Sequence, residues 1–321
     1  MLYQTQLNPR WFRFFETQRG TPCFKVTYSP HKSFVIPIKV DGGYSRFKEF
    51  LEDGWEIKSV SLLNGNGSGN GSGNGKIAVS IEKDYPEPAN DRRYIIGADV
   101  GSSTLATVTV FDSRNGKVVR QLYFGRNVAI RQRKYEDRRS KLQSHADKGS
   151  EKAKKYLRRL KRKQRNFVKT RSGQIAKEIV NLAIKYNASV AVEKLKFRAT
   201  RGKIGKNGRK KINKIPYAQL REFLKSNCLK YGIPFQEVDT YHTSKWCPKC
   251  GALNQGHSSN YALYKCNKCG FVANSDRKAS LAIAIKSLLE RTSQGLTNSC
   301  FIQISKRRVP INGLFVQMMG F

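Results

Sequence analysis

Three acidic residues lie far apart in the sequence: Asp99 in GADVG, Glu193 in VAVEKL and Asp276 in NSDRKAS. Each is weak evidence alone, because an aspartate at a strand end is often only a turn residue and one at a helix start is often only an N-cap. Together they are hard oxygen ligands of the kind that hold Mg²⁺ or Mn²⁺ for phosphodiester cleavage. We therefore predict that Asp99, Glu193 and Asp276 are catalytic acids that bind these metals.

A second candidate metal site consists of four cysteines that precede the last acid. Cys247 and Cys250 in CPKCG, then Cys266 and Cys269 in CNKCGF, have the C-x2-C-x15-C-x2-C spacing of a zinc ribbon, with a glycine after each pair. A redox pair is a poor alternative, because two matched pairs are present and neither opens a helix beside a βαβ unit. Four thiolates complete a tetrahedral site, so we predict a structural Zn²⁺ ion.

The composition indicates what these sites would act on. Lys and Arg number 61 and Asp and Glu 23, which gives a formal net charge of +38. Such an excess suits a phosphate backbone and makes nucleic acid the expected partner. A ribosomal or chromatin protein without catalytic activity would carry a similar charge, so only the motifs favour an enzyme.

The basic residues are concentrated between residues 131 and 171, without a matching set of acids. A solvated helix face usually mixes both signs, so we expect this segment to bind nucleic-acid backbones. A second basic stretch, residues 198–214, has a loop-like composition and is expected to act as a mobile arm on phosphates. The residues predicted to contact nucleic acid are Arg138, Arg139, Lys154, Lys155, Arg158, Arg159, Lys161, Arg162, Lys163, Arg165 and, beside the cysteines, Trp246.

The first 90 residues are expected to form a small β-rich unit. Strand-like runs occupy residues 34–40, 55–63 and 76–82, and the aromatic residues of segment 11–15 suit either base stacking or a core. Residues 64–75, NGNGSGNGSGNG, can bury nothing and should form a flexible loop between two strands. The regularity of this loop suggests a linker that replaces a deleted segment.

The rest of the chain has an α/β pattern that would bring the three acids together. Asp99 ends the first strand of this part, Glu193 ends a later strand, and Asp276 lies in the first turn of the last helix. These strand ends and this helix start should meet at one edge of a sheet. We predict an antiparallel meander of strands at 94–100, 105–111 and 117–124, helices at 128–168, 172–186, 214–231 and 276–290, and further strands at 189–192 and 235–238.

Length and hydropathy limit the architecture. With 321 residues, 39% of them hydrophobic, the chain can bury a core, and its length suggests about two structural units. The sequence contains neither a long apolar run nor a charged-then-apolar leader, so we expect no membrane span and a cytoplasmic location. Cys23, Cys228 and Cys300 are scattered and indicate no disulfide framework, which fits that compartment. A monomer and an oligomer fit these patterns equally.

The order of these motifs resembles that of the TnpB-type RNA-guided nucleases, transposon-encoded relatives of the type V CRISPR effectors. The resemblance covers roughly residues 30–290 and rests on IGADVGSSTLATV, AVEKLKF, YHTSKWCPKCG, CNKCGF and NSDRKASLAIA. It implies an α/β RNase H-like (RuvC) nuclease domain with an inserted zinc ribbon, preceded by a small β-rich, wedge-like domain. It also implies a guide RNA and a target DNA as partners, with DNA cleaved at a single RuvC-like site formed by Asp99, Glu193 and Asp276.

The resemblance also implies a division of the chain into domains. The boundaries are a wedge-like nucleic-acid-binding domain at 1–90, a first part of the nuclease domain with the basic helices at 91–242, the zinc ribbon at 243–272, the last part of the nuclease domain at 273–291 and a tail at 292–321. About 90 residues are few for both a wedge and the helical recognition lobe that is usual in the family.

Two residues depart from the family pattern near the last acid. Lys278 stands where the family usually has Asn, and Ser280 stands where Ala is common. Neither change removes a metal ligand, but a lysine at this place could disturb the site. We keep two alternatives to the RNA-guided endonuclease: a non-cleaving RNA-guided DNA-binding regulator, and an unguided RuvC-like nuclease.

Overall fold

The computed structural model of this chain describes residues 5–7, 11–63, 76–89, 91–101, 104–195, 216–239, 243, 245–253 and 262–295. Contacts between residues divide the chain into two units, Met1–Tyr85 and Pro86–Phe321. The predicted loop at 64–75, the basic arm at 198–214 and all but the first residues of the predicted tail lie outside the described residues.

The first unit contains two small antiparallel sheets and one helix. The helix α1 (Gly42–Glu52) begins after Asp41, whose carboxylate accepts hydrogen bonds from the backbone N–H groups of Gly43 (2.8 Å) and Tyr44 (3.1 Å). The sheets have the orders β1-β5-β6 and β2-β3-β4, formed by β1 (Thr5–Leu7), β2 (Phe12–Glu16), β3 (Pro22–Ser29), β4 (Lys32–Pro37), β5 (Glu56–Leu63) and β6 (Lys76–Glu82).

The aromatic run at the start of this unit is divided between core and surface. The ring centroid of Phe14 lies 5.4 Å from that of Phe24 and 5.3 Å from that of Phe47, so Phe14 packs between β3 and α1. Trp11 remains 44% exposed. β2 and β3 were not among the predicted strands, because aromatic and basic residues in this segment hide the alternation that marks a half-buried strand.

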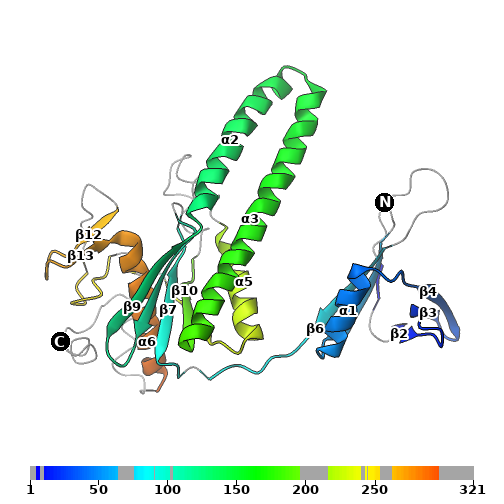
Figure 1. The fold of residues 1–321 in the computed structure, drawn as a ribbon, viewed down its shortest axis with the longest axis horizontal. Helices are drawn as coiled ribbons and strands as arrows, with labels where there is room; N and C mark the ends of the chain where they lie inside the picture. The colour runs from blue at the N-terminus through cyan, green and yellow to red at the C-terminus, as the bar shows by residue number, and fades with distance from the viewer. Residues whose placement is uncertain are drawn as a thin grey trace. The chain divides into compact units, whose positions relative to one another are not determined.

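The second unit is built on a five-stranded sheet with the order β11-β10-β7-β8-β9 (Figure 1). The strands β7 (Tyr94–Asp99), β8 (Ala106–Asp112) and β9 (Lys117–Phe124) form the predicted antiparallel meander. β10 (Ala188–Glu193) pairs parallel with β7, and β11 (Phe235–Val238) pairs parallel with β10. The carboxyl ends of β7 and β10 therefore lie side by side.

Helices cover both faces of this sheet because successive strand residues point to opposite sides. On one side, Ile96 packs with Ile179 of α3 (Glu151–Tyr186) and with Leu224 of α5 (Tyr217–Lys230). On the other side, Ile95 packs with Ile283 of α6 (Ser275–Gly295). Within the part of the chain that the structure covers, no helix is long and apolar enough to span a membrane.

A close approach between α6 and β7 fixes the helix over the sheet. A Cβ atom at Gly97 would lie 2.1 Å from the backbone oxygen of Ser280, so only glycine permits this contact. The Ser280 side-chain oxygen also lies 2.6 Å from that of Thr109 in β8, in a buried hydrogen bond. This packing fixes the start of α6, which carries Asp276, against the strand that ends at Asp99.

The basic segment forms a long helical hairpin of α2 (Arg126–Asp147) and α3, as Figure 1 shows. The predicted break at residues 168–172 is wrong, and the break lies at Lys148–Ser150. There Gly149 has φ 92°, and the Ser150 side chain caps α3 by accepting a hydrogen bond from the Ala153 N–H. Near the predicted break, small residues of the continuous helix allow close packing: Ser172 is buried, and the Cα of Gly173 faces the ring of Phe223.

Candidate active site

The strand register places two of the predicted acids next to each other. Val192 of β10 is paired with Ala98 of β7, so the following residues, Glu193 and Asp99, end their strands side by side. Asp276 lies in the first turn of α6, where the positive end of the helix dipole favours a carboxylate. The three acids that the sequence separates thus meet at one edge of the sheet, and none is fully buried, so solvent can reach them.

Electrostatic repulsion couples the three carboxylates. The pKa of Asp99 is raised to about 8, first by burial and then by the neighbouring charges of Glu193 and Asp276. Burial also raises the pKa of Glu193 and of Asp276. Acids gathered in this way are stabilised in the charged form by a bound cation.

The three carboxylates are hard oxygen donors, and they are not gathered as tightly as the four thiols. Among the described residues, only the four cysteines bring three or more potential ligand atoms within 4.8 Å of one another. The oxygen atoms of the three carboxylates are therefore spread more widely than the ligands of one tight site. Asp99, Glu193 and Asp276 offer the oxygen atoms that Mg²⁺ or Mn²⁺ prefers.

Lys278, the departure from the family pattern, binds the backbone that precedes the cysteine module, and its charge also acts on Asp99 and Glu193. Its Nζ atom donates hydrogen bonds to the backbone oxygens of Thr243 (2.8 Å) and Trp246 (3.1 Å) and lies 4.4 Å from the ring centroid of Tyr264. Burial lowers its pKa to about 8, opposed by nearby negative groups that include Asp99. The lysine is thus a buried cation between two candidate metal sites.

The four cysteines form two matched turns. The Sγ atoms of Cys247 and Cys269 are 3.7 Å apart and those of Cys250 and Cys266 are 3.6 Å apart. A tetrahedral Zn²⁺ with Zn–S bonds of about 2.3 Å would separate its sulfurs by about 3.8 Å. The thiols thus have the spacing of a zinc site, and a thiolate at Cys247, whose pKa burial raises to about 12, needs a cation beside it.

The glycines after each cysteine pair have the role that the sequence predicted. Gly251 and Gly270 have φ of 71° and 69°, and each donates its N–H to the carbonyl of the first cysteine in its pair, at 3.0 Å in both turns. The short strands β12 (Leu263–Lys265) and β13 (Val272–Asn274) lie on either side of the second turn. The module is inserted between β11 and α6.

The predicted nucleic-acid residues differ in exposure. The ten arginines and lysines that were predicted to contact nucleic acid are all exposed on α2 and α3. Lys154 has an ion pair with Glu151 (2.6 Å), which is weak at such an exposed site. Trp246 is buried in the core beneath α6 and forms a bridge with Leu253, so the structure places its ring away from any base-stacking surface.

Sequence reasoning did not identify Thr243 as part of this site. Its hydroxyl group hydrogen-bonds to the Glu193 carboxylate and lowers the pKa of that acid, against the larger effect of burial. Lys286 also lies near Glu193 and favours its charged form. The position of Thr243, four residues before Cys247, was the only signal, because the fold and not the spacing brings it to Glu193.

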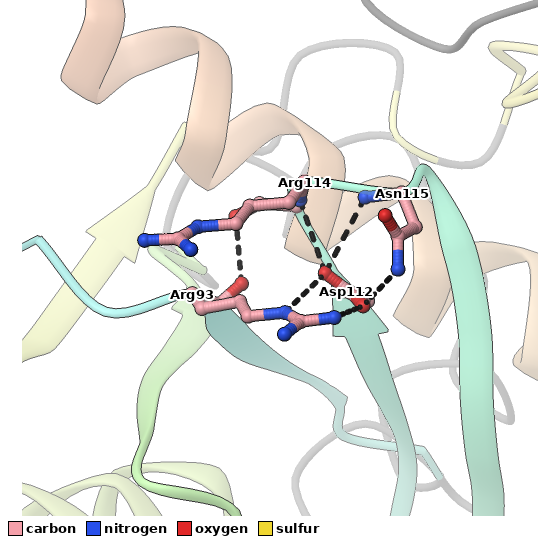
Figure 2. A network of polar contacts seen from close by, with 5 residues as sticks. Arg93, Asp112, Arg114 and Asn115 are labelled. Carbon is pink, nitrogen blue, oxygen red and sulfur yellow. Dashed lines mark hydrogen bonds and ion pairs between the residues drawn. The ribbon is translucent and has the colours of Figure 1, made fainter.

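The opposite end of the β7–β8 pair carries another strand-end aspartate, in a different environment (Figure 2). Arg93 binds Asp112 through two nitrogens, at 3.1 and 2.7 Å. The backbone N–H of Arg114 and the side chain of Asn115 also donate to it. These donors hold the pKa of Asp112 down at about 2, so this acid is a paired structural residue.

Comparison with known proteins finds two family models in this chain. Residues 76–202 match a model described as a probable transposase, and residues 217–283 match the Cas12f1-like TNB domain. A TnpB-like protein of Methanocaldococcus jannaschii is 26% identical over 268 residues, which cover 82% of this chain and 90% of that protein. The CRISPR-associated endodeoxyribonuclease Cas12f1 of Sulfoacidibacillus thermotolerans is 28% identical over 141 residues, 44% of this chain and 32% of that protein.

A solved structure shares the fold. The cryo-EM structure of a Cas12f1–sgRNA–target DNA complex matches with a TM-score of 0.61 and 18% sequence identity. The match covers 88% of this chain and 64% of that one, so this chain spans slightly less than two thirds of its structural neighbour. The chain is therefore a relative of the TnpB-like proteins and of the Cas12f1 endodeoxyribonucleases, which confirms the resemblance that its motifs indicated.

Proposed function

We propose that this protein is an RNA-guided DNA endonuclease that hydrolyses phosphodiester bonds at the edge formed by Asp99, Glu193 and Asp276. The observation that carries the proposal is the convergence of three carboxylates at one sheet edge, where burial and the charges of Glu193 and Asp276 raise the pKa of Asp99 to about 8. Such an arrangement is costly without a cation and suited to binding one. The relatives named above support the class of reaction.

In the reaction, the roles of this chain's residues follow from their positions. Asp99, Glu193 and Asp276 would hold divalent cations, which when bound supply an activated water and stabilise the leaving oxygen. The partial exposure of the acids leaves room for a phosphodiester at the same edge. The cysteine module, with its coordination closed, supports the fold and takes no part in hydrolysis.

The charge of the chain supports nucleic acid as its partner. The net charge is +38, and the exposed basic residues of α2 and α3 line the helical hairpin. We assign guide RNA and target DNA as partners because the neighbour in the solved structure is a complex with both. In this proposal residues 1–90 are a wedge-like domain, residues 91–242 and 273–291 form an RNase H-like domain, and residues 243–272 form the zinc ribbon.

The test is cleavage of a DNA target library by the protein co-expressed with the RNA encoded beside its own gene. We expect RNA-dependent cutting with Mg²⁺ that stops with EDTA and falls by at least about 1,000-fold in Asp99→Ala. Asp91→Ala is the matched control, because Asp91 is an exposed aspartate in the same unit. Binding of target without cutting by the parent protein would instead indicate a regulator, and cutting without RNA would indicate an unguided nuclease.

A further inference from the structure

Asp239, Thr243 and Trp246, which lie between the sheet and the cysteine module in the sequence, are bound by side chains of α6. The residues concerned, 278, 286 and 290, recur at multiples of four and so lie along one side of the helix. Lys286 donates to the backbone oxygen of Asp239 (2.5 Å), and Glu290 accepts a hydrogen bond from the Asp239 N–H. Lys278 then binds the backbone oxygens of Thr243 and Trp246.

Thr243 is the point at which this segment contacts the acids. The residue is only 4% exposed. Its carbonyl oxygen accepts a hydrogen bond from the Nζ atom of Lys278 at 2.8 Å, and its hydroxyl group hydrogen-bonds to the carboxylate of Glu193. One residue therefore links a buried cation of α6 to an acid at the end of β10.

The same ammonium group also connects the acids to the cysteine module. Lys278 lies over the ring of Tyr264, which packs in one cluster with Cys247 and Cys266. Its second acceptor, the Trp246 carbonyl, belongs to the residue directly before the first cysteine. A displacement of the module would therefore move Lys278 and Thr243, and with them the hydrogen bond to Glu193.

We propose that Thr243 is a positioning residue for Glu193 and that Lys278 holds Thr243 in place, so that the cysteine module forms part of the support of the metal site. The proposal rests on the proposed function, in which Glu193 is a metal ligand. A hydroxyl that donates to one lone pair of a carboxylate restricts the direction in which the carboxylate offers its other oxygens. In this proposal, the lysine that stands at 278 in place of the usual Asn supports the metal site through Thr243 and replaces none of the metal ligands.

The experiment compares Thr243→Val with Thr243→Ser in the full-length, zinc-loaded protein. Valine has nearly the same shape but lacks the hydroxyl group, whereas serine retains it, and both keep the carbonyl that Lys278 binds. Mn²⁺ binding is measured by calorimetry without nucleic acid, and the Mg²⁺ dependence of cleavage is measured separately. We expect Thr243→Val to weaken Mn²⁺ binding by about 10-fold to 100-fold, the usual effect of losing a group that orients a metal ligand.

The serine variant should bind Mn²⁺ within about threefold of the parent protein, because its hydroxyl group can still reach Glu193. Zinc content and the thermal midpoint of unfolding should match in all three proteins. Mn²⁺ affinity in Thr243→Val equal to that of the parent would overturn the proposal, and so would equal weakening in both variants. A parent protein that binds Mn²⁺ but cuts no DNA would contradict the proposed function alone, because the binding comparison would still decide this inference.

A second variant tests the part assigned to Lys278. Lys278→Met removes the ammonium while keeping most of the side-chain volume. Because this change also removes a positive charge that acts on Asp99 and Glu193, the test is whether Thr243→Val still weakens Mn²⁺ binding in its presence. The double variant Thr243→Val with Lys278→Met should then bind Mn²⁺ as weakly as Lys278→Met alone, since both changes act on the same hydrogen bond. If the losses of Mn²⁺ affinity in the two single variants add fully in the double variant, Lys278 does not act through Thr243, and its assigned role in holding Thr243 is overturned.

Discussion

The two ends of the β7–β8 pair each carry a strand-end aspartate, and the two differ in every electrostatic respect. Asp112 is almost fully buried, yet its pKa is lowered to about 2 because Arg93 and neighbouring N–H donors bind it. The pKa of Asp99 is instead raised to about 8, first by burial and then by the neighbouring charges of Glu193 and Asp276. The end that holds Asp112 is stable as it stands, and the end that holds Asp99 is suited to bind a cation.

The contrast shows that a strand-end aspartate acquires its role from the partners that the fold brings to it. In the sequence, both residues end β-rich runs and neither position distinguishes structure from function. In the fold, Asp112 is bound by the guanidinium of Arg93, the residue directly before β7. Asp99 instead lies beside Glu193 from a parallel strand and Asp276 from a helix. Predictions about these residues should therefore separate stability from metal binding.

The largest difference should appear when divalent cations are added. Mn²⁺ at about 100 times its dissociation constant should raise the free energy of unfolding of the parent protein by about 2.7 kcal/mol. Asp112→Asn should gain the same increment, because Asp112 lies at the far end of the strands. Asp99→Asn should gain almost nothing. Thermal unfolding with Mn²⁺ and with EDTA measures this, and an equal gain in Asp99→Asn would remove Asp99 from the metal site.

Without added Mn²⁺, we expect a smaller effect on the free energy of unfolding, a loss that should appear in Asp112→Asn and not in Asp99→Asn. Asp112→Asn should lower the free energy of unfolding by about 2 kcal/mol, because it weakens a buried, charge-assisted network whose Arg93 is partly exposed. Asp99→Asn should leave stability unchanged or raise it by about 1 kcal/mol, because it removes a carboxylate from repelling neighbours. Denaturant titration compares the two, and a greater loss in Asp99→Asn would reverse the comparison.

The contribution of Asp112 to the free energy of unfolding should depend on pH through the titration of its carboxyl group. Its folded pKa of about 2 lies below the value of about 3.9 for an unfolded chain, so its contribution is fully present above the unfolded value. The contribution is lost as the pH falls toward 2. The difference in unfolding free energy between the parent protein and Asp112→Asn should therefore narrow between pH 6 and pH 3. A constant difference over this range would show that the network does not depend on the charge of Asp112.

Local patterns predicted the sheet well. The run FQEV was placed at the residues of β11, and the three strands of the meander agree with the structure to within a residue or so. The cysteine spacing and the glycines after it predicted both turns of the module. These features depend on near neighbours in the chain, which is why periodicity and spacing indicate them.

Other features depend on contacts between distant segments and could not be read from the sequence. A helix break was predicted at residues 168–172, but α3 is continuous there, and Gly173 packs against Phe223 of α5. Trp246, beside the cysteines, suggested a contact with nucleic acid, yet it is buried beneath α6. The place of Lys278 two residues after Asp276 did not indicate that its ammonium binds the backbone before the first cysteine while its charge acts on Asp99 and Glu193.

The most direct measurement is a crystal of this protein soaked in Mn²⁺, with anomalous scattering recorded at the manganese edge. We expect anomalous peaks from manganese ions at the sheet edge, bound by carboxylate oxygens of Asp99, Glu193 and Asp276, and no such peak beside Asp112. Manganese that appears only elsewhere, with these three carboxylates free of it at saturating concentration, would contradict the assignment of the active site.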